Sequence, residues 1–245
     1  MNNTLAIVGT IICAILVGLF VFVRIKKGGV LGVYTKILAS FGFVLLGLLL
    51  STNKAVFGEV FNLSAILICA GLVCGLIGDI VLDLKVVYKE DEDKHLPVGM
   101  IAFGIGHFFY IAAMILAIST EVSVCSWDFI WKILLDVFIA ALMTALIWFV
   151  STNVMKLDFK KHLWPTLAYT FVLVFVVAFA VTFTICVPNI KLWIMVIGSV
   201  LFFLSDIVLS TQYFGGKQDD KTLIAVNHIL YYAAQIVIAL FIFAL

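Results

Sequence analysis

The chain has 245 residues, of which 65% are hydrophobic and 12% are charged. Soluble domains carry about 45–50% apolar and about 25% charged residues, so this composition excludes a water-soluble globule, and it also excludes a disordered chain. A net charge of +1 provides no basic face to neutralise nucleic-acid phosphates. We therefore expect an all-α, polytopic membrane protein, forming one transmembrane domain, with no nucleic-acid partner.

Eight stretches of the chain are long and apolar enough to form membrane-spanning helices. A helix needs about 20 mostly apolar residues to cross about 30 Å of hydrocarbon, and lipid offers no partner for an open backbone amide. A β-barrel would instead show short segments of alternating hydrophobicity. The expected spans, of which the second is the shortest, are 5–23, 34–50, 63–84, 97–118, 128–150, 163–185, 191–211 and 222–245.

The basic residues between these spans predict the orientation of the chain. Eight spans put both termini on one side, and that side holds only Lys54, Lys132 and Lys191 of the 15 Lys and Arg residues. Because cytoplasmic loops carry the excess of basic residues, we expect both termini outside the cytosol. The membrane would be the cytoplasmic membrane of a bacterium or, in a eukaryote, the endoplasmic reticulum.

Two short motifs occur twice, four spans apart and in the same order. The sequence GDIVL at 78–82 corresponds to SDIVL at 205–209, and HFFY at 107–110 corresponds to HILY at 228–231. This pattern predicts a duplicated four-helix unit, with halves at about 1–118 and 119–245. Parallel repeats of this kind often form a site at their interface.

The repeated motifs bring one acidic residue from each half to the same depth. Asp79 and Asp206 each lie near the cytosolic end of a span, and Lys36 lies at comparable depth. A charge at the bilayer centre costs about 2.5–3.5 kcal/mol even on a lenient scale, so two such aspartates indicate a shared site. Residues spaced i, i+3, i+4 and i+7 share a helix face, and the eighth span has polar residues at this spacing: His228, Tyr231, Tyr232 and Gln235.

Other polar and reactive side chains have a structural interpretation. Asp136 lies four residues after Lys132, so we expect an ion pair between them on one helix face. The five cysteines show no metal-ligand or disulfide spacing, and we expect them to pack as small apolar side chains.

Four motifs resemble the TMEM86/YhhN family of membrane lysoplasmalogenases. They are GDxxL at 78–82, GxxAFxxxHxxY at 99–110, GxxxFxxSD at 198–206 and YYxxQ at 231–235, in the family's order over about two-thirds of the chain. Lys36 resembles the lysine at the start of the family's second helix, although the proline that usually follows it is Ile37 here.

This resemblance implies an eight-helix enzyme that hydrolyses the vinyl ether bond of lysoplasmalogens. The products would be a fatty aldehyde and glycerophosphoethanolamine or glycerophosphocholine. The resemblance implies neither a metal nor an organic cofactor. The partner would be a lysophospholipid that enters sideways from the cytosolic leaflet, with its tail among the apolar side chains of the surrounding membrane helices.

The residue chemistry is compatible with this reaction. Vinyl ether hydrolysis needs one protonated carboxylic acid and one carboxylate to stabilise an oxocarbenium ion, a division of labour that glycosidases also use. We hypothesise that Asp79 and Asp206 form this pair, without assigning which is the acid, and that Lys36 holds the phosphate. The expected substrate-binding residues are Lys36, His107, Tyr110, Asn227, His228, Tyr231, Tyr232 and Gln235.

Two other functions fit parts of the same pattern. Duplicated halves with intramembrane polar residues also describe a proton-coupled transporter of small molecules or lipids. A lipid-binding or scaffold protein without enzymatic activity would share the apolar surface, but it would leave bound lipid chemically intact.

Overall fold

The computed structural model describes residues 2–56, 63–88, 92–119, 123–187 and 189–245. Over these residues the chain is all-α and contains no strand, and each of its eight long helices is long and apolar enough to cross a membrane. The helices are α1 (Asn2–Lys26), α2 (Gly29–Val56), α3 (Leu63–Asp83), α4 (Glu92–Ile118), α5 (Trp127–Asn153), α6 (Leu163–Cys186), α7 (Trp193–Phe214) and α8 (Lys221–Phe241).

The second helix differs most from its expected span. It was expected to be the shortest, but α2 has 28 residues and is the longest of the eight helices in the described part of the chain. The expected span counted only 34–50, whereas the helix begins earlier, with the sequence GVLGV at 29–33, and continues through STNKAV at 51–56. Neither the glycines at its start nor the polar residues at its end interrupt the helix.

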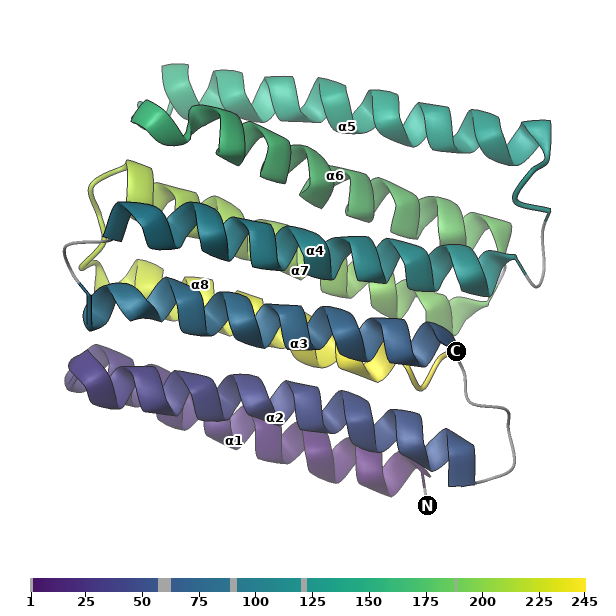
Figure 1. The fold of residues 1–245 in the computed structure, drawn as a ribbon, viewed down its shortest axis with the longest axis horizontal. Coiled ribbons are helices and arrows are strands. Elements are labelled where there is room, and N and C mark those ends of the chain that lie inside the picture. Colours follow the sequence, from purple (N-terminus) through teal and green to yellow (C-terminus); the bar gives the residue numbers. More distant parts are fainter. Residues whose placement is uncertain (1, 57–62, 89–91, 120–122, 188) are drawn as a thin grey trace.

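All eight helices run roughly along the long axis of the molecule, and both termini lie at the same end (Figure 1). In this view α1 and α2 form one edge of the bundle and α5 forms the other, with α3, α4, α7 and α8 in the middle. The most extensive helix contacts are those of α3 with α4 and of α7 with α8. The site residues described below come mainly from these central helices and from α2.

Contacts between the halves follow part of the pattern that a duplication predicts. In a four-helix repeat, α1 corresponds to α5, α2 to α6 and α4 to α8. The contact between α4 and α6 therefore corresponds to the contact between α8 and α2, and both are present. The contact between α1 and α8 would correspond to one between α5 and α4, but α5 makes no comparable contact with α4. The duplication itself stays a prediction. Because α5 packs extensively only against α6 in the described residues, it lies at the margin of the bundle.

Close approach of α3 to α4 depends on glycine. A Cβ atom added to Gly71 would lie 2.9 Å from the Gly106 carbonyl oxygen and would overlap the Tyr110 ring. Small residues let two membrane helices pack backbone against backbone, and here they bring Tyr110 into the centre of the bundle, where it is 2% exposed.

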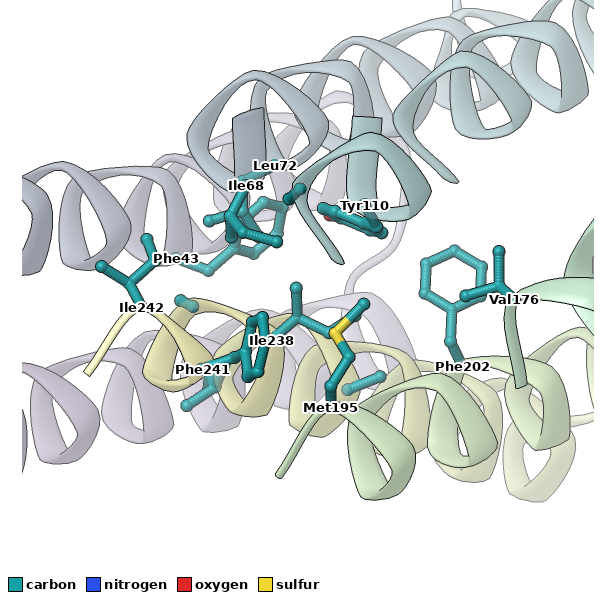
Figure 2. Packing of buried hydrophobic residues seen from close by; sticks show 14 of the residues in the cluster. Phe43, Ile68, Leu72, Tyr110, Val176, Met195, Phe202, Ile238, Phe241 and Ile242 are labelled. Carbon is teal, nitrogen blue, oxygen red and sulfur yellow. The ribbon is translucent and has the colours of Figure 1, made fainter. Parts of the chain in front are cut away.

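Apolar side chains from both halves of the chain fill the bundle's centre. Figure 2 shows side chains of α2 and α3 on one side of this core and side chains of α7 and α8 on the other, among them Phe43, Ile68, Leu72, Met195, Ile238 and Phe241. Dense packing of this kind holds side chains in single positions, so the polar residues that border the core are also held in place.

The expected ion pair between Asp136 and Lys132 is wrong. Lys132 pairs with Asp128, one turn toward the helix start, and Asp136 accepts a hydrogen bond of 3.0 Å from the Thr182 hydroxyl of α6. The i,i+4 rule applies in both directions along a helix. Asp136 is buried against α6 whereas the Asp128 side chain is exposed, so the lysine pairs with the carboxylate that shares its exposed face.

Candidate functional site

Asp79 on α3 is buried and receives three polar contacts. Its Oδ2 atom accepts hydrogen bonds from the Ser40 hydroxyl at 2.6 Å and from the Tyr231 hydroxyl at 2.7 Å. Its Oδ1 atom lies 3.2 Å from Lys36 Nζ. An ionised carboxylate only accepts hydrogen bonds, so this set of donors on α2 and α8 is suited to the charged form of Asp79.

Lys36 links Asp79 to a second buried aspartate. Its Nζ atom also lies 3.2 Å from Asp83 Oδ1, and Asp83 in turn pairs with Arg24 of α1. Charges of alternating sign therefore run from Arg24 through Asp83 and Lys36 to Asp79 inside the bundle. Buried charges are tolerated when they are paired in this way.

Three members of this arrangement, Arg24, Ser40 and Asp83, are not among the site residues predicted from the sequence. Asp83 lies one turn after Asp79 on α3, which was a usable signal, but it was not selected for the site. Arg24 counted only toward orientation, although it pairs with Asp83. Ser40, which donates to Asp79, carried no signal because isolated serines are common in membrane helices.

Three residues expected to bind substrate form hydrogen bonds around Asp79 and do not line the two cavities described below. Tyr110 donates to the Gln235 side-chain oxygen at 3.2 Å, and Gln235 Nε2 donates to the Tyr231 hydroxyl at 3.1 Å. The Tyr232 hydroxyl lies 2.8 Å from Ser40 Oγ and donates to the Lys36 carbonyl at 3.2 Å. Tyr110, Gln235 and Tyr232 thus support the residues that contact Asp79.

The two histidines of the repeated motifs make the same local contact. His107 Nδ1 lies 2.7 Å from the Phe103 carbonyl oxygen, and His228 Nδ1 lies 2.7 Å from the Ile224 carbonyl oxygen. Their surroundings differ, because His107 packs edge-on against the Phe202 ring whereas His228 lines the polar cavity described next. Of the two, the structure places only His228 beside the charged residues.

Asp79 and Asp206 line one cavity of about 120 Å³, which we call the polar cavity. It lies at the end of the bundle opposite the termini, between α1, α2, α3, α7 and α8. The structure thus brings the two repeated aspartates to a common wall, although their chemical roles stay a prediction. Other polar residues of the wall include Arg24, Lys36, Asp83, Lys85, Asn227, His228 and Tyr231.

Asp206 has a different environment from Asp79. No cation pairs with it in the described part of the chain, and its buried Oδ2 atom has no hydrogen-bond partner there. Tyr169 of α6 is close enough to interact with the carboxylate, although no contact of its hydroxyl meets the geometry of a hydrogen bond. Asp79 therefore has donors at both carboxylate oxygens, whereas Oδ2 of Asp206 is available to a ligand.

A second, larger cavity meets the polar cavity at Asp206. This apolar cavity measures about 250 Å³ and lies among α4, α5, α6 and α7, with a lining that includes Leu96, Met100, Leu146, Leu173 and Phe203. The two cavities share Leu82, Phe103, Asp206, Leu209 and Tyr213. Asp206 therefore lies at the border between the polar cavity and the apolar cavity.

Residues 31–242 match the model of the YhhN family. The matched segment covers most of the chain and contains Asp79, Asp206 and every residue expected to bind substrate, whereas Arg24 lies before it. No curated protein and no solved structure matches the chain. In the described residues, no group of three or more His, Cys, Asp or Glu side chains could hold a metal ion.

Proposed function

Because this chain belongs to the YhhN family, which includes the TMEM86 lysoplasmalogenases, we propose that it is a lysoplasmalogenase-type hydrolase. It cleaves the vinyl ether bond of a lysoplasmalogen to a fatty aldehyde and glycerophosphoethanolamine or glycerophosphocholine. The observation that carries this proposal is the position of Asp206, where the polar cavity shared with Asp79 meets the apolar cavity.

The two adjoining cavities suit a lipid with one tail and a zwitterionic headgroup. The tail occupies the apolar cavity, and the headgroup occupies the polar cavity, which is lined by three cationic and three acidic side chains: Arg24, Lys36, Lys85, Asp79, Asp83 and Asp206. In this arrangement the bond between tail and glycerol lies near Asp206. Burial of the tail supplies most of the binding energy.

We assign the acid and the carboxylate from their contacts. Asp206, which has no cationic partner in the described residues, donates a proton to the alkenyl carbon next to the tail. Asp79, held by Lys36, Ser40 and Tyr231, stays ionised and stabilises the oxocarbenium ion. Clustered carboxylates in different environments divide the acid and base roles in this way.

Water then completes the reaction. It adds to the oxocarbenium carbon and loses a proton to the Asp206 carboxylate, which restores the acid. The hemiacetal so formed breaks its carbon–oxygen bond to glycerol, its hydroxyl proton passes to the departing glycerol oxygen, and the carbon becomes the aldehyde carbonyl. One water is consumed for each bond cleaved, and no redox step or cofactor takes part.

Arg24 joins Lys36 as a cation for the phosphate. Lys36 was assigned this role from the sequence, and its Nζ atom already contacts the carboxylates of Asp79 and Asp83. Arg24 lines the same cavity, and its Nε atom has no hydrogen-bond partner in the described part of the chain. The guanidinium group of an arginine presents N–H donors in a planar geometry that suits phosphate oxygens, and the Nε donor of Arg24 is available for such a contact.

The lipid enters from the cytosolic leaflet, and both termini lie outside the cytosol. The basic residues around the end that holds the polar cavity support this orientation. The membrane is the bacterial cytoplasmic membrane or, in a eukaryote, the endoplasmic reticulum.

The test is aldehyde release by the purified protein in detergent. We expect release from a lysoplasmalogen and none from the matched lysolipid with a saturated ether, which cannot form the oxocarbenium ion by protonation. Asp79→Asn and Asp206→Asn should each abolish release while the protein elutes as the wild type does in size-exclusion chromatography. Full activity of either variant would disprove the role assigned to that residue.

The same preparation distinguishes the other two functions. Reconstituted vesicles that take up a labelled solute or lipid without releasing aldehyde would identify a transporter, for which the buried charges from Arg24 to Asp79 would form the coupling site. Bound lysolipid recovered intact, with neither uptake nor release, would identify a lipid-binding protein.

A further inference from the structure

A third cavity, of about 30 Å³, lies between α5, α6 and α7 and is rich in hydroxyl groups. We call it the hydroxyl cavity. Its apolar lining includes Ile147, Phe159 and Leu167, and no charged side chain lines it. Its polar lining consists of five hydroxyl side chains: Thr144, Ser151, Thr166, Thr170 and Ser210.

Two of these hydroxyls are buried without a hydrogen-bond partner in the described part of the chain. Thr144 is 9% exposed and Thr166 is 7% exposed, and the Oγ1 atom of each has no partner. An unpaired buried hydroxyl costs free energy, because it has lost its hydrogen bonds to water without replacement. Such groups therefore indicate a polar ligand in the cavity.

Other hydroxyls in these membrane helices avoid this cost locally. Thr184 donates to the Val181 carbonyl at 2.7 Å, Ser199 to the Val196 carbonyl at 3.0 Å and Ser205 to the Phe202 carbonyl at 2.7 Å. A hydroxyl bonded to its own helix is the common solution in an apolar environment. Thr144 and Thr166 depart from it, and both do so on the wall of the same small cavity.

The hydroxyl cavity adjoins the apolar cavity, which Asp206 also lines. Thr166, Thr170, Ser151, Ser210 and Ile147 line both cavities. On α6, Thr166, Tyr169 and Thr170 are spaced i, i+3 and i+4, which places them on one helix face. Tyr169 and Asp206 both line the apolar cavity and interact with each other, and one oxygen of each has no contact in hydrogen-bonding geometry.

We propose that the hydroxyl cavity binds the water molecule that hydrolysis consumes. The cavity is large enough to hold water, and a buried water molecule needs two to four polar partners, which the hydroxyls of this cavity supply. The uncharged lining suits water better than an ion. Thr144 and Thr166 hold the water, and Tyr169 guides it toward the reacting carbon beside Asp206.

This proposal rests on the proposed function and answers a problem that it raises. A bound lipid fills the apolar cavity with its tail and the polar cavity with its headgroup, so bulk water is excluded from the reacting bond. Hydrolysis nevertheless needs one water at the oxocarbenium carbon after Asp206 has given up its proton. The hydroxyl cavity, next to the lipid tail in the apolar cavity, supplies this water without exposing the bound lipid to bulk water.

Water binding is tested first, without any substrate. Radiolysis of the detergent-solubilised protein in ¹⁸O-labelled water produces hydroxyl radicals at bound waters, which oxidise adjacent side chains. We expect oxidation of Leu167 and Phe159, which line the hydroxyl cavity, and we expect the double variant Thr144→Val/Thr166→Val to lose most of it. Unchanged oxidation in that double variant would overturn the proposal.

The role of this water is tested by kinetics. Thr166→Val keeps the side-chain shape and removes the hydroxyl. Because the variant misplaces the water, kcat for aldehyde release should fall at least about tenfold. Because lipid binding is unaffected, KM should change by less than about twofold. Thr166→Ser keeps the hydroxyl and should retain most of the activity. Thr184→Val, on the same helix, removes a hydroxyl that already has a partner and serves as the control.

The two tests separate the proposals. If the wild type releases no aldehyde from any vinyl ether, the proposed function fails, and the oxidation experiment still decides whether the cavity holds water. If oxidation is lost in the double variant but kcat stays at the wild-type value in Thr166→Val, the water is structural and the delivery role is wrong.

Discussion

The Tyr231 hydroxyl of α8 donates a hydrogen bond to Asp79 Oδ2 of α3 at 2.7 Å, across 152 residues of sequence. This contact lets the C-terminal part of the chain hold an aspartate supplied by the N-terminal part. Gln235 donates to Tyr231 and Tyr110 donates to Gln235, so α4, α8 and α3 are linked by one line of hydrogen bonds. Such buried networks hold their members in fixed positions when every member is satisfied.

Replacing Tyr231 by phenylalanine should reduce aldehyde release. The change removes one of three donors to Asp79 and keeps the ring, and a hydrogen bond to a charged group contributes about 1.5–3 kcal/mol, which corresponds to a rate about tenfold lower or more. Release is measured at saturating lysoplasmalogen. Tyr34→Phe, on the exposed face of α2, is the control, and equal rates for the two variants would contradict the role given to Tyr231.

Replacing Lys36 by methionine should destabilise the bundle strongly. The variant leaves Asp79 without a cation and Asp83 with Arg24 alone, and an uncompensated buried charge costs about 3–5 kcal/mol. Thermal unfolding in detergent measures the effect. The double variant Lys36→Met/Asp79→Asn removes both charges and should recover part of the lost stability. If the double variant unfolds at a temperature no higher than that of Lys36→Met alone, loss of the ion pair is not the cause of the destabilisation.

Replacing Gly71 by alanine should separate α3 from α4. The new methyl group would overlap the Tyr110 ring and approach the Gly106 carbonyl, and overpacking of a core costs about 1–3 kcal/mol. Unfolding in detergent would show it. Gly104→Ala lies on α4 at a position with nothing within 4 Å of the new atom, so that variant should unfold as the wild type does, and equal losses in both would refute the steric explanation.

The contacts of Asp136 predict that removing the Thr182 hydroxyl destabilises the protein, whereas removing the Lys132 charge does not. Thr182→Val removes the hydroxyl that donates to Asp136 from α6 and should lower stability by about 1 kcal/mol, in the range of interhelical hydrogen bonds in membranes. Lys132→Gln disrupts only an exposed pair with Asp128, so no measurable change is expected. Thermal unfolding of both variants checks this, and the reverse order would restore the pairing of Asp136 with Lys132.

Much of the fold could be predicted because membrane spans are recognised locally. Eight apolar stretches appear as eight helices, since each helix satisfies its own backbone hydrogen bonds within lipid. The errors occurred where local rules meet polar residues. The extent of α2 was underestimated because it begins with the glycine-containing stretch 29–33 and ends with the polar stretch 51–56. Asp136 was paired with Lys132 because spacing alone does not say which helix face is buried.

The candidate site was predictable only in part. Asp79 and Asp206 stood out because charged residues are costly in a membrane and because their motif repeats. Ser40 and Tyr169 did not stand out, since a single hydroxyl in a helix is unremarkable until its neighbours are known. Tyr110, Tyr232 and Gln235 were predicted to bind substrate. The structure buries them and connects them by hydrogen bonds to Ser40, Lys36 or Tyr231, and their role in binding stays a prediction.

The amino-acid sequence by itself determined that this protein is a bundle of eight membrane helices with the aspartate of a recurring motif, Asp79 or Asp206, in each half. The lipid environment makes both features visible, because it demands long apolar helices and penalises charge. Only the tertiary structure decided that Asp79 is surrounded by donors while Asp206 borders two cavities. That difference depends on how each helix is rotated about its axis against its neighbours, and this rotation results from contacts between residues far apart in the chain.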